Sequence, residues 1–63
     1  MAEAPDPLRT LRHDLSNPLA AILAETQLAL LNADRLDAET VASLRQIETL
    51  SRKMSQILHA LDV

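Results

Sequence analysis

Apolar side chains recur at steps of three and four residues along two stretches of this 63-residue chain, and this spacing constrains its fold most strongly. The first stretch carries, with one threonine among them, Leu8, Leu11, Leu15, Leu19, Ile22, Thr26 and Leu30. The second carries Val41, Leu44, Ile47, Leu50, Met54, Ile57, Leu58 and Leu61, with Arg45, Thr49, Arg52, Lys53 and Gln56 opposite. At about 100° per residue, each set falls on one face of a helix. The spacing therefore predicts two amphipathic helices and an all-α fold.

The start of the first helix is marked by Asp6 and Pro7, which suit an N-cap and the first helical position. We expect this helix over residues 7–32, preceded by a flexible N-terminal segment over residues 1–6. The chain has no glycine, the costliest ordinary residue inside a helix, and it is rich in Ala and Leu, which are good helix formers. This composition supports long helices.

The polar sequence NADRLD, which begins at Asn32, has the character of a short turn. We expect the turn over residues 33–37, with Asp37 as the N-cap of a second helix over residues 38–62. A connection this short makes consecutive helices antiparallel. Residues 7–63 are therefore predicted to form one domain, an antiparallel two-helix hairpin.

A single hairpin of this size has too little core. Domains this small usually need a disulfide, a metal or a partner chain to offset their ordering entropy. The chain has no cysteine, and its potential ligands form no clustered pattern, so we expect no metal site. Pairing two hairpins around a twofold axis would close the core. We therefore expect a homodimeric four-helix bundle.

Composition also excludes some classes of function. The net charge of −3 and the lack of aromatic residues argue against nucleic-acid binding. No apolar run is long enough to span a membrane, so this segment is expected to make no membrane contact. The first residues, MAEAPDP, have neither the basic nor the apolar part of a signal peptide. The lack of cysteine fits a reducing compartment, and we expect a cytoplasmic location.

The outward side of the first helix is unusual. With Leu15 at the centre of the buried face, His13 lies about 160° and Asn17 about 200° around the helix. His13 and Asn17 are neighbours at i and i+4, and Asp14 and Asn17 at i and i+3. The same side carries the apolar residues Ala20, Ala21, Ala24, Leu28 and Leu31. This strip is either a docking surface beneath an exposed histidine or a run of good helix formers at the bundle margin.

Pro18 lies inside the first helix, where it removes the hydrogen bond to the carbonyl of Asp14 at a cost of roughly 3 kcal/mol. We expect the helix to bend there, one turn after His13. A harmless kink is the alternative, but a broken local rule beside reactive side chains favours a functional site.

Residues 13–22, with the sequence HDLSNPLAAI, resemble the H-box of sensor histidine kinases, commonly written H-E-L-R-T-P-L-x-x-I. The histidine, the following acid, Leu15, the Pro-Leu pair and Ile22 are in register. The second helix is similar to the family's second helix but less distinctive, and the resemblance spans roughly residues 8–63. The usual Arg-Thr pair is replaced by Ser16-Asn17, and Arg12 stands where a serine is common. These departures bear on partner contacts and leave the phosphoacceptor position intact.

The resemblance implies the dimerisation and phosphoacceptor domain of a two-component histidine protein kinase. It implies that His13 is the phosphoacceptor, Asp14 the general base or orienter, and Asn17 the residue that positions water in the phosphatase reaction. A neutral imidazole has the lone pair that this chemistry needs. ATP and Mg would be held by a separate catalytic domain with glycine-rich boxes, since this chain has no glycine. The chain alone is expected to bind no cofactor and to be inactive.

By the same resemblance, the receiver domain of a response regulator would dock on Ala21, Ala24, Glu25 and Leu28 and accept the phosphoryl group on an aspartate. Arg9, four residues before His13, could pair with the phosphate, although a solvated surface arginine is the more economical interpretation. His59 comes to about the level of His13 in an antiparallel hairpin. It has no matched ligand, and we interpret it as an ordinary surface histidine.

Two alternatives remain open. The first is a purely structural helical-hairpin dimer, an interaction module in which His13 is incidental. The second is a degenerate acceptor domain that binds a regulator on the first helix without phosphotransfer. The first predicts that His13→Ala changes nothing but solubility, and the second predicts receiver binding without transfer.

Overall fold

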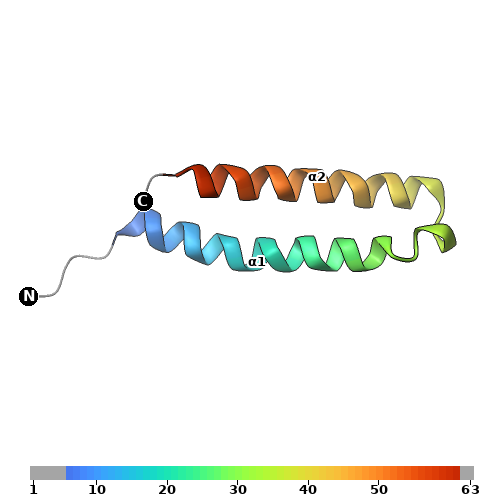
Figure 1. Ribbon diagram of the computed structural model, residues 1–63, viewed down its shortest axis with the longest axis horizontal. Coiled ribbons are helices and arrows are strands. Elements are labelled where there is room, and N and C mark those ends of the chain that lie inside the picture. The colour runs from blue at the N-terminus through green and yellow to red at the C-terminus, as the bar shows by residue number, and fades with distance from the viewer. Residues whose placement is uncertain (1–5, 62–63) are drawn as a thin grey trace, which may run out of the picture.

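The computed structural model describes residues 6–61 as two antiparallel helices, with both ends of the described chain at one end of the molecule (Figure 1). Helix α1 spans Pro7–Leu30 and helix α2 spans Ala38–Ala60. A single 3-10 turn, η1, spans Ala33–Arg35 and joins them. The predicted helical hairpin is confirmed. The expected flexible segment over residues 1–6 lies outside the described residues except for Asp6.

Both helices begin at an aspartate cap, as the sequence predicts. The Oδ1 atom of Asp6 accepts hydrogen bonds from the backbone N–H groups of Leu8, at 3.0 Å, and Arg9, at 3.3 Å. The Oδ1 atom of Asp37 accepts one from the N–H of Thr40 at 2.6 Å. Hydrogen bonding to the side chain and backbone of Thr40 lowers the pKa of the Asp37 carboxyl from its ordinary value. Each cap satisfies a donor that the first helical turn leaves without a partner.

Helix α1 ends earlier than the expected residue 32. The backbone N–H groups of Leu31 and Asn32 bond to the carbonyls of Leu28 and Ala29, three residues back, at 3.2 and 3.1 Å. These bonds tighten the last turn toward 3-10 geometry, and η1 follows at once. The chain reverses without a residue of positive φ among those described. The hairpin therefore turns through 3-10 geometry and needs no glycine.

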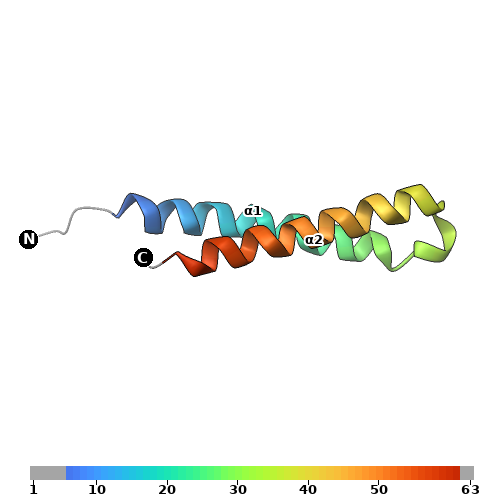
Figure 2. The ribbon, with the colours of Figure 1, turned by 90° about the horizontal axis from the view of Figure 1, so that it is seen from above.

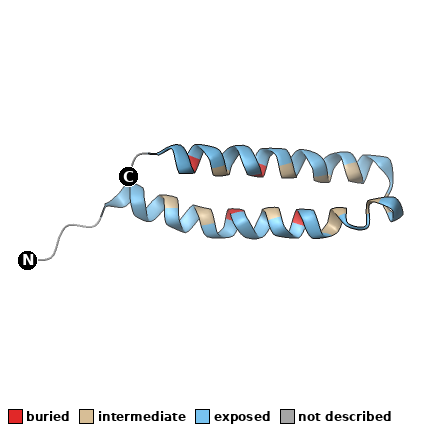
Figure 3. Cartoon of the chain, viewed as in Figure 1, coloured by how far each residue is buried: buried red, intermediate tan, exposed pale blue. Residues whose placement is uncertain are grey.

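The seam between the helices is partly polar. Leu19 and Thr26 of α1 are buried there, as are Ser51 and Leu58 of α2 (Figure 3). Half-buried residues complete it: Arg12, Ser16, Leu23 and Leu30 on α1, and Val41, Leu44, Glu48 and Ser55 on α2. In Figure 2 the two helices cross near their middles, so each contacts the other along a narrow line. One hairpin consequently buries few large apolar side chains.

Most of the apolar stripe seen in the sequence lies beside this seam, exposed. Leu11 and Leu15 on α1 are 51% and 42% exposed, and Met54 on α2 is 52% exposed. From the 100° helical step, the exposed apolar residues lie about 70° from the seam on α1 and about 110° from it on α2. Both offsets run in the same rotational sense, which in antiparallel helices points to one side of the hairpin. We call this side the apolar face; it comprises Leu8, Leu11, Leu15, Ile22, Ile47, Leu50, Met54, Ile57 and Leu61.

Polar contacts join the helices near the seam. Glu48 Oε2 accepts hydrogen bonds from Gln27 Nε2 across the seam at 3.4 Å and from Arg52 Nη2 at 3.3 Å. Near the open end of the hairpin, Arg12 Nη1 donates to the carbonyl of Leu61 at 3.3 Å. The contacts of Gln27 with Glu48 and of Arg12 with Leu61 show which residues of the two halves of the hairpin lie at the same level. Within residues 6–61, neither helix is long and apolar enough to cross a membrane.

Candidate functional site

His13 projects from α1 into solvent beside an acid. Its side chain is 75% exposed and that of Asp14 is 69% exposed, and Nδ1 of His13 lies 3.6 Å from Oδ1 of Asp14. This distance is too long for a hydrogen bond. The neighbouring carboxylate nevertheless favours the tautomer whose proton is on Nδ1, the nitrogen that it approaches. That tautomer leaves a lone pair on Nε2, where an electrophile in solution can reach it.

The backbone around His13 departs from regular helix hydrogen bonding. Pro18 lies inside α1, which continues through it, and it offers no N–H to the carbonyl of Asp14. Two residues earlier, the hydroxyl of Ser16 donates to the carbonyl of Arg12 at 2.6 Å. Back-bonding of this kind and a proline both tend to bend a helix. In Figure 1 the blue first turns of α1 slope toward α2, whereas the later turns run level with it.

Asn17 lies one turn beyond His13, at the rim of a groove between the helices. The groove has a volume of about 310 Å³ and is lined by Ser16, Asn17, Leu19, Ala20 and Leu23 of α1 and by Ser51, Ser55 and His59 of α2. The buried residues Leu19 and Ser51 lie at its floor, and the exposed residues Asn17 and His59 lie at its rim. On α1, the same 100° step places His13 on the long side of the hairpin that is opposite the apolar face. We call this side the histidine side.

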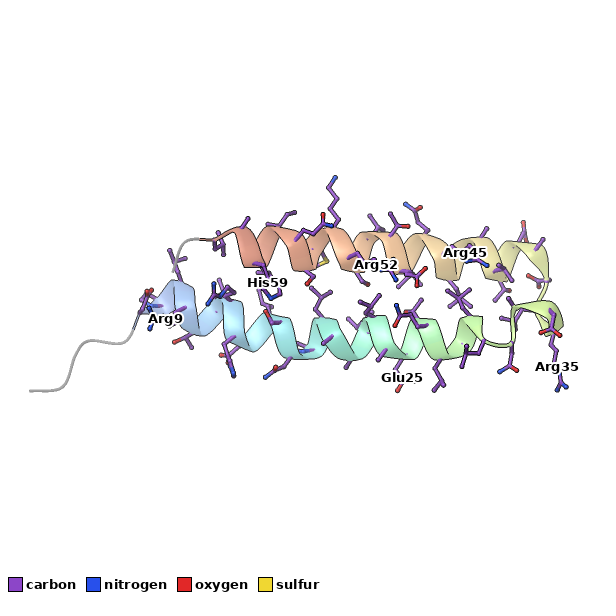
Figure 4. The ribbon with its side chains drawn as sticks, in the orientation of Figure 1. Arg9, Glu25, Arg35, Arg45, Arg52 and His59 are labelled. Carbon is purple, nitrogen blue, oxygen red and sulfur yellow. The ribbon has the colours of Figure 1, made fainter. Side chains whose placement is uncertain are left out.

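His59 takes part in this groove, which the sequence pattern did not indicate. In Figure 4 its side chain extends from α2 toward α1. Its Nδ1 atom lies 2.8 Å from the backbone carbonyl of Ser55 and 3.3 Å from the Ser55 hydroxyl. The i, i+4 spacing of a serine and a histidine on one helix is the signal that could have pointed to this contact.

The residues expected to bind a receiver are all exposed on α1. From the helical step, Ala21, Ala24 and Leu28 face away from α2, and Glu25 lies toward the edge of the apolar face. Glu25 points away from α2 in Figure 4. Arg9 is exposed as well, and among the described residues no ion pair involves it. The structure thus brings His13 together with Asp14, and Asn17 together with His59, and leaves the docking strip open.

No protein-family model, no curated protein and no solved structure matches the chain. Among residues 6–61, no group of three His, Cys, Asp or Glu side chains is placed to hold a metal ion together.

Proposed function

We propose that this hairpin is the dimerisation and phosphoacceptor domain of a sensor histidine kinase in a two-component system, with His13 as the phosphoacceptor. The observation that carries the proposal is the placement of His13. Its imidazole is solvent-exposed beside the Asp14 carboxylate, on the side of the hairpin away from the exposed apolar face. A partner enzyme could reach the ring there while the apolar face is covered.

In the proposed reaction, Nε2 of His13 attacks the γ-phosphorus of ATP, which with Mg²⁺ is held by a separate catalytic domain. The P–N bond forms as the bond to the β–γ bridging oxygen breaks, and ADP leaves with the electron pair. Asp14 is the group next to Nδ1, and it takes the ring proton or holds the ring in place. An aspartate of a receiver domain then attacks the phosphorus and returns the electron pair to Nε2.

The second half of the proposal is a homodimeric four-helix bundle. Most of the exposed large apolar side chains of α1 and α2 lie on the apolar face, which runs nearly the whole length of the hairpin. A second copy presents the same face, so a twofold axis would cover both at once. Contiguous apolar faces of this extent mark association surfaces. The seam of one hairpin buries only Leu19 and Leu58 as large apolar side chains among the described residues.

The receiver would dock on the exposed strip made by Ala21, Ala24, Glu25 and Leu28, which begins one turn below Asn17. Small side chains let a partner helix approach closely, and Leu28 supplies apolar area. Asn17 would orient water against the receiver's acyl phosphate in the phosphatase reaction. We place these steps in the cytoplasm, where ATP is available.

The test is phosphorus NMR of the purified chain after incubation with phosphoramidate. We expect an acid-labile phosphohistidine signal that His13→Ala abolishes and that His59→Ala, the matched control, retains. Adding the catalytic domain of a histidine kinase with ATP should label the same residue. If neither donor labels His13 while the chain still dimerises, the structural hairpin module becomes the better account.

A further inference from the structure

His59 is the group on the histidine side that the phosphoacceptor proposal leaves without a role. Its Nδ1 atom lies 2.8 Å from the Ser55 carbonyl oxygen, which can only accept a hydrogen bond. Nδ1 of the neutral ring must therefore carry the proton and donate it. Nε2 is then left with a lone pair. The fold thus fixes the tautomer of His59 and makes its second nitrogen a proton acceptor.

The other polar groups of the groove are mostly engaged. The Ser16 hydroxyl donates to the Arg12 carbonyl at 2.6 Å, and the Ser55 hydroxyl lies 3.3 Å from Nδ1 of His59. The Asn17 amide makes no hydrogen bond to another described residue. Asn17 and Nε2 of His59 are therefore two groups that can hold a water molecule at the rim of this groove.

On α1 the groove begins at Ser16, about one turn beyond His13, and on α2 its end nearest to His13 is formed by His59. The hydrogen bond from Arg12 to the Leu61 carbonyl places this part of α1 beside the last turn of α2, two residues beyond His59. The helical step puts His13 and His59 on the same long side of the hairpin, and Asn17 follows His13 by one turn. A phosphoryl group on Nε2 of His13 would have Asn17 and His59 as polar neighbours.

We propose that His59 is the proton acceptor for a water molecule that hydrolyses the phosphohistidine formed at His13, with Asn17 orienting that water. This inference rests on the proposed phosphoacceptor role of His13. The lifetime of phosphorylated His13 would then be set by residues of the hairpin itself, independent of any receiver.

The step balances without a further reactant. The water oxygen attacks phosphorus, the P–N bond breaks, and its electron pair returns to Nε2 of His13. One water proton passes to Nε2 of His59, which becomes imidazolium and later releases it to solvent. The His13 ring regains one proton from solvent, on the side of Asp14. The products are neutral His13 and hydrogen phosphate.

The experiment follows the loss of the phosphorus NMR signal after the chain is labelled with phosphoramidate and the reagent is removed. His59→Gln keeps a hydrogen-bonding group near the Nε2 position but cannot take a proton. We expect it to lengthen the phosphohistidine half-life at neutral pH by about tenfold to 100-fold, at or below the usual contribution of a positioned base. Asn17→Ala should lengthen the half-life less.

The matched control is Gln56→Ala, an exposed polar residue of the same helix that does not line the groove. It should leave the half-life unchanged, and circular dichroism should show equal helicity in all variants. Equal half-lives for the unmodified chain and His59→Gln would overturn this inference and leave the phosphoacceptor role intact. A chain that forms no phosphohistidine at all would overturn both.

Discussion

The two long sides of the hairpin are built from the same two helices but carry opposite chemistry. The apolar face presents leucine, isoleucine and methionine side chains that are 36–56% exposed, with few groups able to form a hydrogen bond. The histidine side presents imidazole, amide and hydroxyl groups around a groove. Around each helix, less than half a turn separates the apolar face from the histidine side. An apolar face has many interchangeable residues, whereas on the histidine side each polar group has its own position and partner.

Because of this difference, substitutions on the two sides should act in different ways. On the apolar face, a change acts through the area that it removes or the charge that it introduces. On the histidine side, it acts through one atom, such as Nε2 of His13 or Nε2 of His59. Stability and oligomeric state should therefore respond to the first side, and phosphoryl chemistry to the second.

The largest effect is expected from Leu15→Glu, which places a charge at the centre of the apolar face. Each buried leucine stabilises the folded assembly by about 1.5–3 kcal/mol, and a twofold-symmetric dimer carries the substitution in both copies. We expect dimers to become monomers, with a large loss of helicity, measured by sedimentation equilibrium and circular dichroism.

The matched control for that change is Ala24→Glu, which introduces the same charge on the exposed strip of α1 that faces away from α2. It should leave the dimer intact. Equal dissociation in both variants would show that charge anywhere on α1 disrupts the chain, and the two sides would not be distinct.

A smaller effect is expected from Leu19→Ala in the seam. Leu19 is 6% exposed, the lowest value for a large apolar residue among those described. Large-to-small changes at such positions cost about 2–5 kcal/mol. Urea unfolding should show this loss while phosphohistidine formation in the folded chain remains. A loss of labelling without a loss of stability would couple the seam to His13.

Pro18→Ala should act in the opposite direction. The new N–H can bond to the Asp14 carbonyl, and alanine is about 3 kcal/mol better than proline inside a helix. We expect a higher unfolding midpoint in urea, by at most this amount. A lower midpoint would mean that the proline ring, which lies toward the apolar face, packs in the dimer.

The smallest effect is expected at Asp37, the N-cap of α2, which belongs to neither the apolar face nor the histidine side. Hydrogen bonding to Thr40 lowers the pKa of Asp37 below its ordinary value of 3.8. The ionised cap therefore stabilises the fold above that pH, and the contribution is lost as the pH falls through the lowered pKa. Asp37→Ala should lower the thermal midpoint slightly at neutral pH and not at all in strong acid. Asp6→Ala, which removes the N-cap of α1 instead, serves as the comparison for Asp37→Ala.

The sequence predicted the architecture because its signals are local. Asp6, Pro7 and Asp37 mark helix starts through hydrogen bonds within one turn, and the structure has both helices beginning there. The end of α1 was placed two residues too far, at residue 32. Without a glycine at the helix end, nothing in the sequence showed that the 3-10 tightening begins at Leu31.

The seam was harder to predict because two apolar surfaces adjoin on each helix. Periodicity grouped Leu15 and Ile22 with Leu19 and Thr26, although only the latter pair lies against α2. It also left out Arg12 and Ser16, whose half-buried positions depend on the crossing of the helices. The groove at Asn17 and His59 depends on the same crossing and on a rotamer of His59, which no pattern along one helix contains.

The connection through η1 also sets how α1 and α2 are rotated about their axes relative to each other. Adding one residue within the first turn of α2, between Ala38 and Val41, would rotate the rest of α2 by about 100° relative to the turn. The exposed apolar residues of α2 would then point to a different side from those of α1, although every side chain were kept. The proposed association surface therefore depends on a count of residues as well as on their identity. Single-residue insertions and deletions there should consequently be tolerated far less than substitutions.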